Sequence, residues 1–238
     1  MIPVGILGAT GMVGQQFIAL LAHHPWFKVE WLGASQRSEG KTFTDAAAWR
    51  LPSPLPVDVA RRTVEAATPG NAPKLMFSGL DSSVAGEIEA AFAQAGHIIV
   101  SNSRNYRMER TVPLLIPEVN ADHLALLEAQ GAATGWKGRI VTNPNCATVV
   151  IAMALAPLRQ FGLTSTLVTT MQAISGAGYP GVPSWDILGS GRTVLKGQWG
   201  RYLHMAAANF GSSFNPATAT VTTFTWRDLN NNLLYETG

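Results

Sequence analysis

The chain has 238 residues, of which 47% are hydrophobic and 13% are charged, and its formal net charge is +2 at pH 7. This composition excludes a disordered chain, and the scattered lysines and arginines exclude the basic runs typical of a nucleic-acid groove. The single cysteine excludes an intramolecular disulfide and any metal site built from several cysteines. The N-terminus lacks a basic segment before its short apolar stretch, which argues against a signal peptide or a membrane span. We therefore expect a cytoplasmic α/β protein with no nucleic-acid partner, no membrane partner and no bound metal.

Hydrophobic periodicity predicts alternating strands and helices along most of the chain. Short apolar or β-branched runs predict strands, whereas apolar residues at helical spacing predict helices. Strands are expected at residues 2–7, 27–33, 74–78, 97–101, 139–142 and 163–174, with another near 217–226. Helices are expected at residues 12–24, 83–95, 121–130 and 147–161. The proline-rich segment 50–73 is expected to be irregular, apart from a strand near 57–63.

This alternation predicts an α/β fold with a doubly wound parallel sheet of the Rossmann type. The first β-α-β unit lies within residues 2–33, the length of a mononucleotide-binding half. We expect a dinucleotide-binding domain over residues 1–143 and a second domain over residues 144–238. The β-α rhythm stops near residue 189, so the second domain is expected to have an atypical tail.

A glycine-rich loop joins the first predicted strand to the first predicted helix. Its glycines, Gly8, Gly11 and Gly14, have the spacing GxxGxxG. Glycine permits a tight turn and lets backbone N–H groups at a helix start approach a pyrophosphate closely. The loop therefore predicts a dinucleotide site, although a glycine turn without a ligand has the same spacing.

The end of the second predicted strand indicates which dinucleotide binds. An NAD site usually has an acid there, bonded to the ribose 2′-hydroxyl. This chain has Ser35, Arg37 and Ser38 instead. Hydroxyl donors and a guanidinium suit a 2′-phosphate, so the sequence predicts NADP rather than NAD. The alternative is that Arg37 is a solvated loop residue.

The only cysteine, Cys146, lies where a predicted strand passes into a predicted helix. The segment before it, Asn143-Pro144-Asn145, is typical of a turn. A helix start stabilises a thiolate, so Cys146 is a candidate nucleophile; the alternative is a small buried hydrophobe. A glycine-rich loop, 172–181, follows, and its first residue, Gln172, offers an amide donor and acceptor.

Several segments occur in an order and spacing shared with one known family. They are GATGMVGQ (8–15), GASQRSEGK (33–41), FSGLDSSVA (77–85), SNSRNYRM (101–108), PLLIPEVN (113–120), TNPNCAT (142–148) and QAISGAGYPGVPSWDIL (172–188). Together they resemble the aspartate-semialdehyde dehydrogenases, particularly the archaeal and fungal branch. The resemblance implies NADPH-dependent interconversion of aspartyl 4-phosphate and aspartate semialdehyde, in the biosynthesis of lysine, threonine and methionine.

The resemblance also implies a role for individual residues. Cys146 would form an acyl thioester, Asn145 would orient it, and Gln172 would contact the substrate. Asn102 and Arg107 would hold a phosphate or a carboxylate. The residues implied to line NADP are Gly8, Thr10, Gly11, Met12, Val13, Ser35, Arg37, Ser38, Ser78, Gly79, Leu80, Ser175 and Gly176.

Residues 189–238 depart from the family pattern. The family's later arginine and catalytic histidine have no match there, and His204 lies in an unrelated context. We therefore expect an incomplete α+β substrate and dimerisation domain, and a homo-oligomer only if that domain is intact. A frameshift, a retained intron or a truncated gene model would each explain such a tail.

Three alternative functions remain. One is an NADP-binding but catalytically impaired member of the same family. Another is an enzyme that acts on N-acetylglutamyl phosphate, in which glycine would precede and an aromatic residue would follow the cysteine; Asn145 and Ala147 argue against it. The last is a reductase with a GATG loop and no covalent step, which would leave Cys146 unexplained.

Overall fold

The computed structural model describes residues 1–169 and the backbone of residues 185–186 and 194–195. The chain divides into two units, Met1–Pro183 and Ser184–Gly238. The described part of the second unit is an antiparallel pair, β7 (Trp185–Asp186) and β8 (Val194–Leu195). The predicted strand near 217–226 lies outside the described residues.

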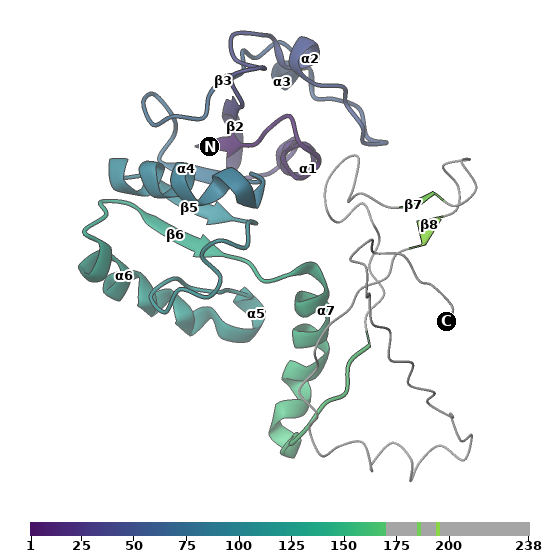
Figure 1. The fold of residues 1–238 in the computed structure, drawn as a ribbon, viewed down its shortest axis with the longest axis vertical. Helices are drawn as coiled ribbons and strands as arrows, with labels where there is room; N and C mark the ends of the chain where they lie inside the picture. The colour runs from purple at the N-terminus through teal and green to yellow at the C-terminus, as the bar shows by residue number, and fades with distance from the viewer. Residues whose placement is uncertain (170–184, 187–193, 196–238) are drawn as a thin grey trace, which may run out of the picture. The chain divides into compact units, whose positions relative to one another are not determined.

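The first unit is built on a six-stranded sheet with the order β3-β2-β1-β4-β5-β6, in which every pair is parallel (Figure 1). The strands are β1 (Ile2–Leu7), β2 (Phe27–Ala34), β3 (Glu65–Ala66), β4 (Leu75–Ser78), β5 (Ile98–Ser101) and β6 (Arg139–Thr142). The chain winds outward from β1 in one direction and then from β4 in the other, so the predicted doubly wound fold is confirmed.

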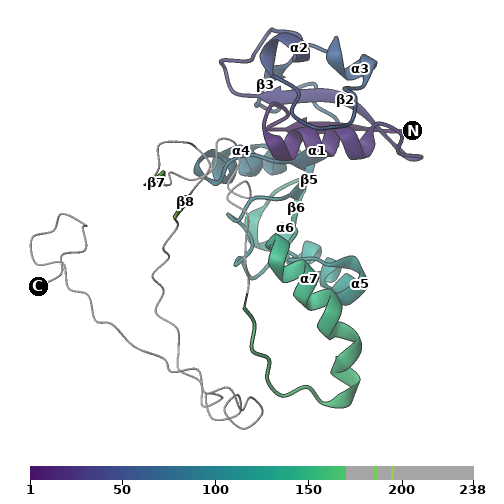
Figure 2. The ribbon, with the colours of Figure 1, turned by 90° about the vertical axis from the view of Figure 1, so that its right-hand side faces the viewer.

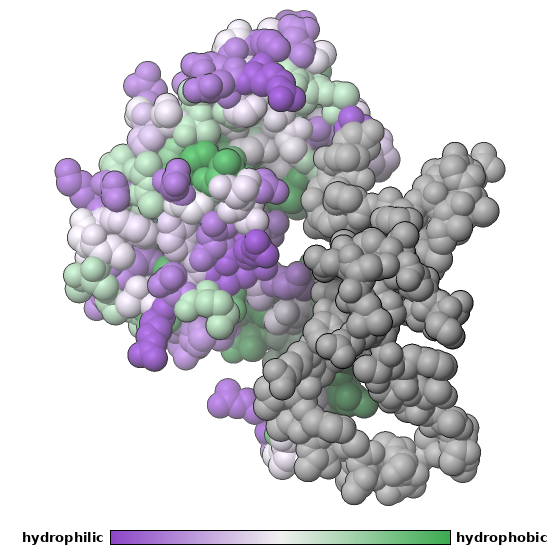
Figure 3. Space-filling model, in the orientation of Figure 1, coloured by the Kyte–Doolittle hydropathy of each residue, from purple (hydrophilic) through white to green (hydrophobic). Residues whose placement is uncertain are grey.

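Among the described residues, the helices of nine residues or more are α1 (Met12–Leu21), α4 (Ser82–Ala95), α6 (Leu126–Thr134) and α7 (Cys146–Leu155). Shorter turns of helix are α2 (Phe43–Ala46), α3 (Val57–Ala60), α5 (Pro117–Asn120), η1 (Ala121–Ala125) and η2 (Ala156–Phe161). In Figures 1 and 2, α2 and α3 lie side by side above β2 and β3. Hydrophilic residues gather over this end of the molecule in Figure 3. Within the described ranges, no helix is long and apolar enough to cross a membrane.

Two predicted strands differ from the structure. The strand expected near 57–63 is wrong, because Pro56 begins the helical turn α3 there and the strand follows at β3. Proline fixes φ near the helical value and suits the start of a helix better than a ladder position. Residues 163–169 have no regular structure, so the strand expected over 163–174 is wrong in that part. Its remainder lies outside the described residues.

Alternation along β1 builds a core on both faces of the sheet. Val4 and Ile6 pack with Ile18 of α1 on one face, whereas Leu7 packs with Phe92 of α4 on the other. All five side chains are fully buried, and burying each one stabilises the fold by about 1.5–3 kcal/mol. The sheet is therefore held rigidly from both sides, which fixes the loops at its ends.

Gln130 protects the outer edge of the sheet. β6 is the last strand of the sheet, and at its outward edge only Thr142 pairs with another segment, in a bridge to Leu114. The Gln130 side chain on α6 donates from Nε2 to the carbonyl of Ile140 at 2.9 Å and accepts at Oε1 from the Ile140 N–H at 2.9 Å. Its amide thus takes the place of a seventh strand at that residue.

Replacing Gln130 with leucine is expected to destabilise the protein by about 2–4 kcal/mol, because two buried backbone groups lose their partners. Urea denaturation followed by circular dichroism measures the change. The matched control is Glu128→Leu, at an exposed position of the same helix, which should change stability by about 0.5 kcal/mol or less. Equal effects of the two substitutions would contradict the edge role.

Candidate functional site

The register of the sheet brings the predicted site residues to one edge. The last residues of four parallel strands lie in one row across the sheet: Leu7, Ser78, Ser101 and Thr142. The residues that follow them are Gly8, Gly79, Asn102 and Asn143. Each of these four residues therefore lies just beyond the carboxyl edge of the sheet. The direction in which successive strands are added reverses between β1 and β4. Ligands of doubly wound sheets bind at this edge.

The glycine loop is shaped by a close approach to the loop after β4. Gly8 has φ +73°, and a Cβ there would lie 2.8 Å from the carbonyl oxygen of Gly79. A Cβ on Gly79 would lie 2.9 Å from Cγ1 of Val13. Gly11 is the N-cap of α1 and provides no side-chain cap. The first N–H groups of α1 are therefore left for a ligand, and the helix dipole favours an anionic one.

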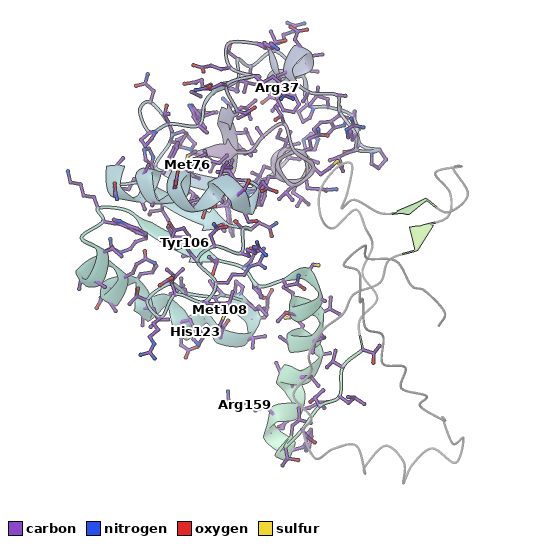
Figure 4. The ribbon with its side chains drawn as sticks, viewed as in Figure 1. Arg37, Met76, Tyr106, Met108, His123 and Arg159 are labelled. Atoms are coloured by element: carbon purple, nitrogen blue, oxygen red, sulfur yellow. The ribbon has the colours of Figure 1, made fainter. Side chains whose placement is uncertain are left out.

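The loop after β2 folds into a turn, with the N–H of Ser38 donating to the carbonyl of Ser35 at 2.8 Å. Ser38 is buried, whereas Ser35 and Arg37 are exposed. Figure 4 labels Arg37 in this loop. An exposed guanidinium in a turn that also carries serines is suited to a phosphate on the ribose of a bound dinucleotide.

A polar cluster links the loops after β5 and β6. Asn143 donates from Nδ2 to Oδ1 of Asn102 at 2.9 Å, and Arg107 donates from Nη2 to the carbonyl of Asn102 at 2.8 Å. Oδ1 of Asn143 and Nε of Arg107 are both buried and have no partner. Because buried polar atoms are usually paired, these two atoms point to a ligand that presents both a donor and an acceptor.

The thiol lies within electrostatic reach of this cluster. Burial lowers the pKa of the Arg107 guanidinium, and its electrostatic interaction with Cys146 opposes that shift. Arginine stays protonated in proteins, so the cluster offers a partly desolvated cation beside the cysteine. An anionic group bound at Arg107 would therefore be held by a cation that interacts electrostatically with Cys146.

Cys146 is the first residue of α7 and is exposed. Asn145 is the N-cap: its Oδ1 accepts from the N–H of Ala147 at 3.0 Å and lies 3.9 Å from Sγ of Cys146. The cap holds the helix start in place, and the second contact orients the thiol. The exposure of Cys146 is compatible with a nucleophile that a substrate can reach.

Glu89 is a polar residue of this edge that the sequence analysis missed. Its side chain is fully buried on α4, and its Oε1 accepts from the hydroxyls of Ser78 at 2.6 Å and Ser101 at 2.8 Å. The signal was present in the spacing, since Ala85, Glu89 and Phe92 share the apolar face of α4. An acid on an apolar helix face needs partners from elsewhere in the fold.

Glu89 gives the stability of the protein a dependence on pH. Burial raises the pKa of this carboxyl above its ordinary value of 4.5, and the two serine hydroxyls oppose the rise. Tyr106, from the loop after β5, is the titratable group that interacts with it, and the pKa of its phenol is raised by its own burial and by Glu89. Above pH 4.5 the folded state keeps a proton that the unfolded state loses, so rising pH destabilises the fold.

We expect the unfolding free energy of the wild type to fall relative to that of Glu89→Gln as the pH rises from 4.5, because glutamine does not titrate. Urea titrations at a series of pH values test this. Glu87→Gln, at an exposed position of the same helix, should follow the wild type. A constant difference between wild type and Glu89→Gln would contradict the expectation.

Other predicted features lie elsewhere or outside the described residues. Gln172, Ser175, Gly176 and His204 belong to the segments that the structure does not describe. A cavity of about 390 Å³ is lined by Trp31, Glu39, Thr68 and their neighbours, and none of the predicted site residues lines it. Within the described ranges, no group of three or more His, Cys, Asp or Glu residues could hold a metal ion.

Comparison with known proteins shows the family of this chain. Residues 3–127 match the family described as semialdehyde dehydrogenase, NAD binding domain. The chain belongs to the semialdehyde dehydrogenase family. The matched segment covers the glycine loop, the Ser35–Ser38 turn and the loop that carries Asn102 and Arg107, and it ends before Cys146.

The semialdehyde dehydrogenases most similar to this chain include archaeal and fungal proteins, as the resemblance predicted. The aspartate-semialdehyde dehydrogenase of Archaeoglobus fulgidus is 48% identical over 204 residues, which are 82% of this chain and 57% of that protein. The one from Cryptococcus neoformans var. neoformans is 48% identical over 205 residues, or 83% of this chain and 56% of that protein. The chain thus spans a little more than half the length of these relatives.

A solved structure shares the fold of this semialdehyde dehydrogenase domain. The crystal structure of aspartate semialdehyde dehydrogenase with NADP from Candida albicans superposes with a TM-score of 0.63 and 42% identity. The superposition covers 68% of this chain and 48% of that one. The predicted fold class and family are confirmed by these comparisons.

Proposed function

We propose that the chain carries the dinucleotide-binding half and the nucleophile of an NADP-dependent aspartate-semialdehyde dehydrogenase. The observation that carries this proposal is the position of Cys146, exposed at the start of α7 and within electrostatic reach of the partly buried Arg107. The named relatives and the NADP complex from Candida albicans support it. The substrates would be aspartyl 4-phosphate or, in reverse, aspartate semialdehyde and phosphate.

Different residues of this chain would perform different steps of the reaction. The Cys146 thiolate attacks the acyl carbon of aspartyl phosphate, the C–S bond forms, and the C–O bond to phosphate breaks. Arg107 and Asn102 hold the phosphate or the carboxylate through charge-assisted hydrogen bonds. N–H groups near the start of α7 stabilise the oxyanion. NADPH, when bound, supplies the hydride that displaces the thiolate and leaves the aldehyde.

The cofactor would lie across the carboxyl edge between the two halves of the sheet. Its pyrophosphate fits the start of α1, where Gly8 and Gly79 leave a cradle that side chains would fill. Thr10, Met12, Val13 and Leu80 would line the same cradle, together with Ser175 and Gly176 from the segment outside the described residues. Ser78 would support this cradle from behind, because it is fully buried and its hydroxyl donates to Glu89.

Arg37 is expected to select NADP(H) over NAD(H). Arg37→Ala should weaken NADP(H) binding by about 1–3 kcal/mol, the range for a charge-assisted contact, and should leave NAD(H) binding nearly unchanged. Fluorescence titration of both reduced cofactors measures the effect. Gln36→Ala, at the exposed position beside it, is the matched control. Equal dissociation constants for the two cofactors in the wild type would refute this choice of cofactor.

The test of the proposed function is NADPH binding combined with phosphate-dependent NADPH formation from aspartate semialdehyde. We expect binding, with a kcat at least about a hundredfold below that of a full-length relative, because positioned proton transfer contributes about 10²–10⁴-fold. Binding without turnover would select the impaired family member instead. Comparable kcat values would show that residues 189–238 supply the missing groups. Failure to bind NADPH would refute the proposal.

We also propose the coarser organisation that follows from the resemblance. The dinucleotide-binding domain would end at residue 143, and residues 144–238 would belong to the substrate and dimerisation domain. A cytoplasmic homo-oligomer is the expected state where that second domain is intact. Sedimentation of the full chain measures its oligomeric state.

A further inference from the structure

The Glu89 carboxyl occupies the junction between two loops of the candidate site. Its side chain is fully buried. Ser78, which ends β4, and Ser101, which ends β5, both donate their hydroxyls to the same oxygen, Oε1. The other oxygen, Oε2, is buried and has no partner. Among the described residues the one ion pair joins Lys28 to Glu30, so no cation in that part of the chain neutralises Glu89.

Such a carboxyl is unfavourable for stability, so stability does not account for a glutamate at this position. A buried acid with an unpartnered oxygen costs free energy that an apolar residue at the same place would not. The rest of the buried face of α4 includes Ala85, Phe92 and Ala93, so an apolar side chain would fit the pattern of the helix. The feature that leucine could not reproduce is one acceptor shared by two strand ends.

The loops that follow these two strands would bind different ligands of the proposed reaction. After Ser78, the N–H of Gly79 donates to the carbonyl of Leu7 at 2.9 Å, which ties the cofactor loop to β1. After Ser101 comes Asn102, whose Oδ1 accepts from Asn143 and whose carbonyl accepts from Arg107. Glu89 thus lies behind both the loop after β4, on the cofactor side, and the loop after β5, on the anion side.

The Ser101 hydroxyl connects Glu89 to the loop after β5, which carries Asn102 and Arg107. Oγ of Ser101 donates to Glu89 and at the same time accepts from the N–H of Ser103 at 3.0 Å. Ser103 then donates to Asn105 at 2.6 Å, and Asn105 donates to the carbonyl of Ser82 on α4 at 2.9 Å. Without the acceptor on Glu89, the Ser101 hydroxyl has no fixed direction, and the first bond of this series is weakened.

We propose that Glu89 is a positioning residue that holds the ends of β4 and β5 together through Ser78 and Ser101, and so sets the cofactor loop and the Asn102–Arg107 loop relative to each other. This inference rests on the proposed function. Glutamine provides the same acceptor and should replace Glu89 in this role, whereas alanine should not.

The experiment uses the full chain and two readouts that do not need turnover. One is the dissociation constant of NADPH, measured by fluorescence. The other is the concentration of inorganic phosphate that halves the rate at which iodoacetamide alkylates Cys146, the only thiol in the chain. Glu89→Ala should raise both values at least about fivefold, the effect of losing one net hydrogen bond. Glu89→Gln should stay within about twofold of the wild type on both.

Two further variants separate positioning from general destabilisation. Phe92→Leu lies on the same helix in the core and should lower stability without moving either readout by more than about twofold. Ser101→Ala removes only the hydroxyl on the anion side, so it should raise the phosphate value and leave the NADPH value unchanged. Ser101→Ala decides the question if Glu89→Ala does not fold.

Three outcomes would overturn the proposal. Glu89→Ala could change the NADPH dissociation constant and the protecting phosphate concentration no more than Phe92→Leu does, or Glu89→Gln could change them as much as Glu89→Ala. The third is that phosphate protects the wild type, and Ser101→Ala needs the same phosphate concentration as the wild type. A wild type that phosphate does not protect would instead contradict the anion site of the proposed function. In that case the NADPH readout of Glu89→Ala and Glu89→Gln still decides the role of Glu89.

Discussion

Replacing Cys146 with serine is expected to lower phosphate-dependent NADPH formation at least about a thousandfold, because a hydroxyl at neutral pH is a far weaker nucleophile than a thiolate. The NADPH dissociation constant should stay within about twofold, since the cofactor contacts lie on other loops. Mass spectrometry of the protein mixed with aspartate semialdehyde and NADP should show an acyl adduct in the wild type and none in the variant.

The structure explains why the effect should be confined to chemistry. Cys146 is exposed and makes one weak contact, 3.9 Å from its sulfur to Oδ1 of Asn145, so serine fits without repacking. Thr148→Ser, an exposed position two residues further along α7, is the matched control and should keep the wild-type rate. If Cys146→Ser retains activity within about tenfold of the wild type, the reaction has no covalent step, and a reductase without a thioester becomes the better account.

Arg107→Ala is expected to lower kcat/KM for phosphate and aspartate semialdehyde. The lowering corresponds to a loss of about 2–5 kcal/mol in transition-state stabilisation, the range for removing a desolvated charged partner. The guanidinium is half-buried, its Nε has no protein partner, and burial lowers its pKa. It has therefore already lost part of its hydration before an anion binds. Steady-state kinetics with varied phosphate measure the loss.

Two comparisons make the Arg107 result specific. Arg107→Lys keeps a charge but loses the planar fork, so it should recover only part of the lost free energy. Arg110→Ala removes an exposed arginine from the same loop and should change kcat/KM by less than about threefold. A loss shared equally by Arg107→Ala and Arg110→Ala would mean that the loop acts only through its net charge.

Local sequence determined much of the first domain. β1 and β6 begin and end where the apolar runs predicted, because a strand buried in a parallel sheet reads as a short apolar run. The glycine spacing and the turn before Cys146 also placed a glycine-rich loop and a thiol at helix starts. The positions of these features along the chain follow from local residue patterns, so the sequence is enough to predict them.

Tertiary structure alone decided how these parts meet. Asn143 donates a hydrogen bond to Asn102, 41 residues earlier in the chain. Gln130 of helix α6 bonds the backbone of Ile140 at the outer edge of strand β6. Glu89 meets Ser78 and Ser101 because the register of β4 and β5 brings their last residues side by side. A helical pattern shows that Glu89 faces inward but not which strands lie there, since strand order and register are set by packing of the whole sheet.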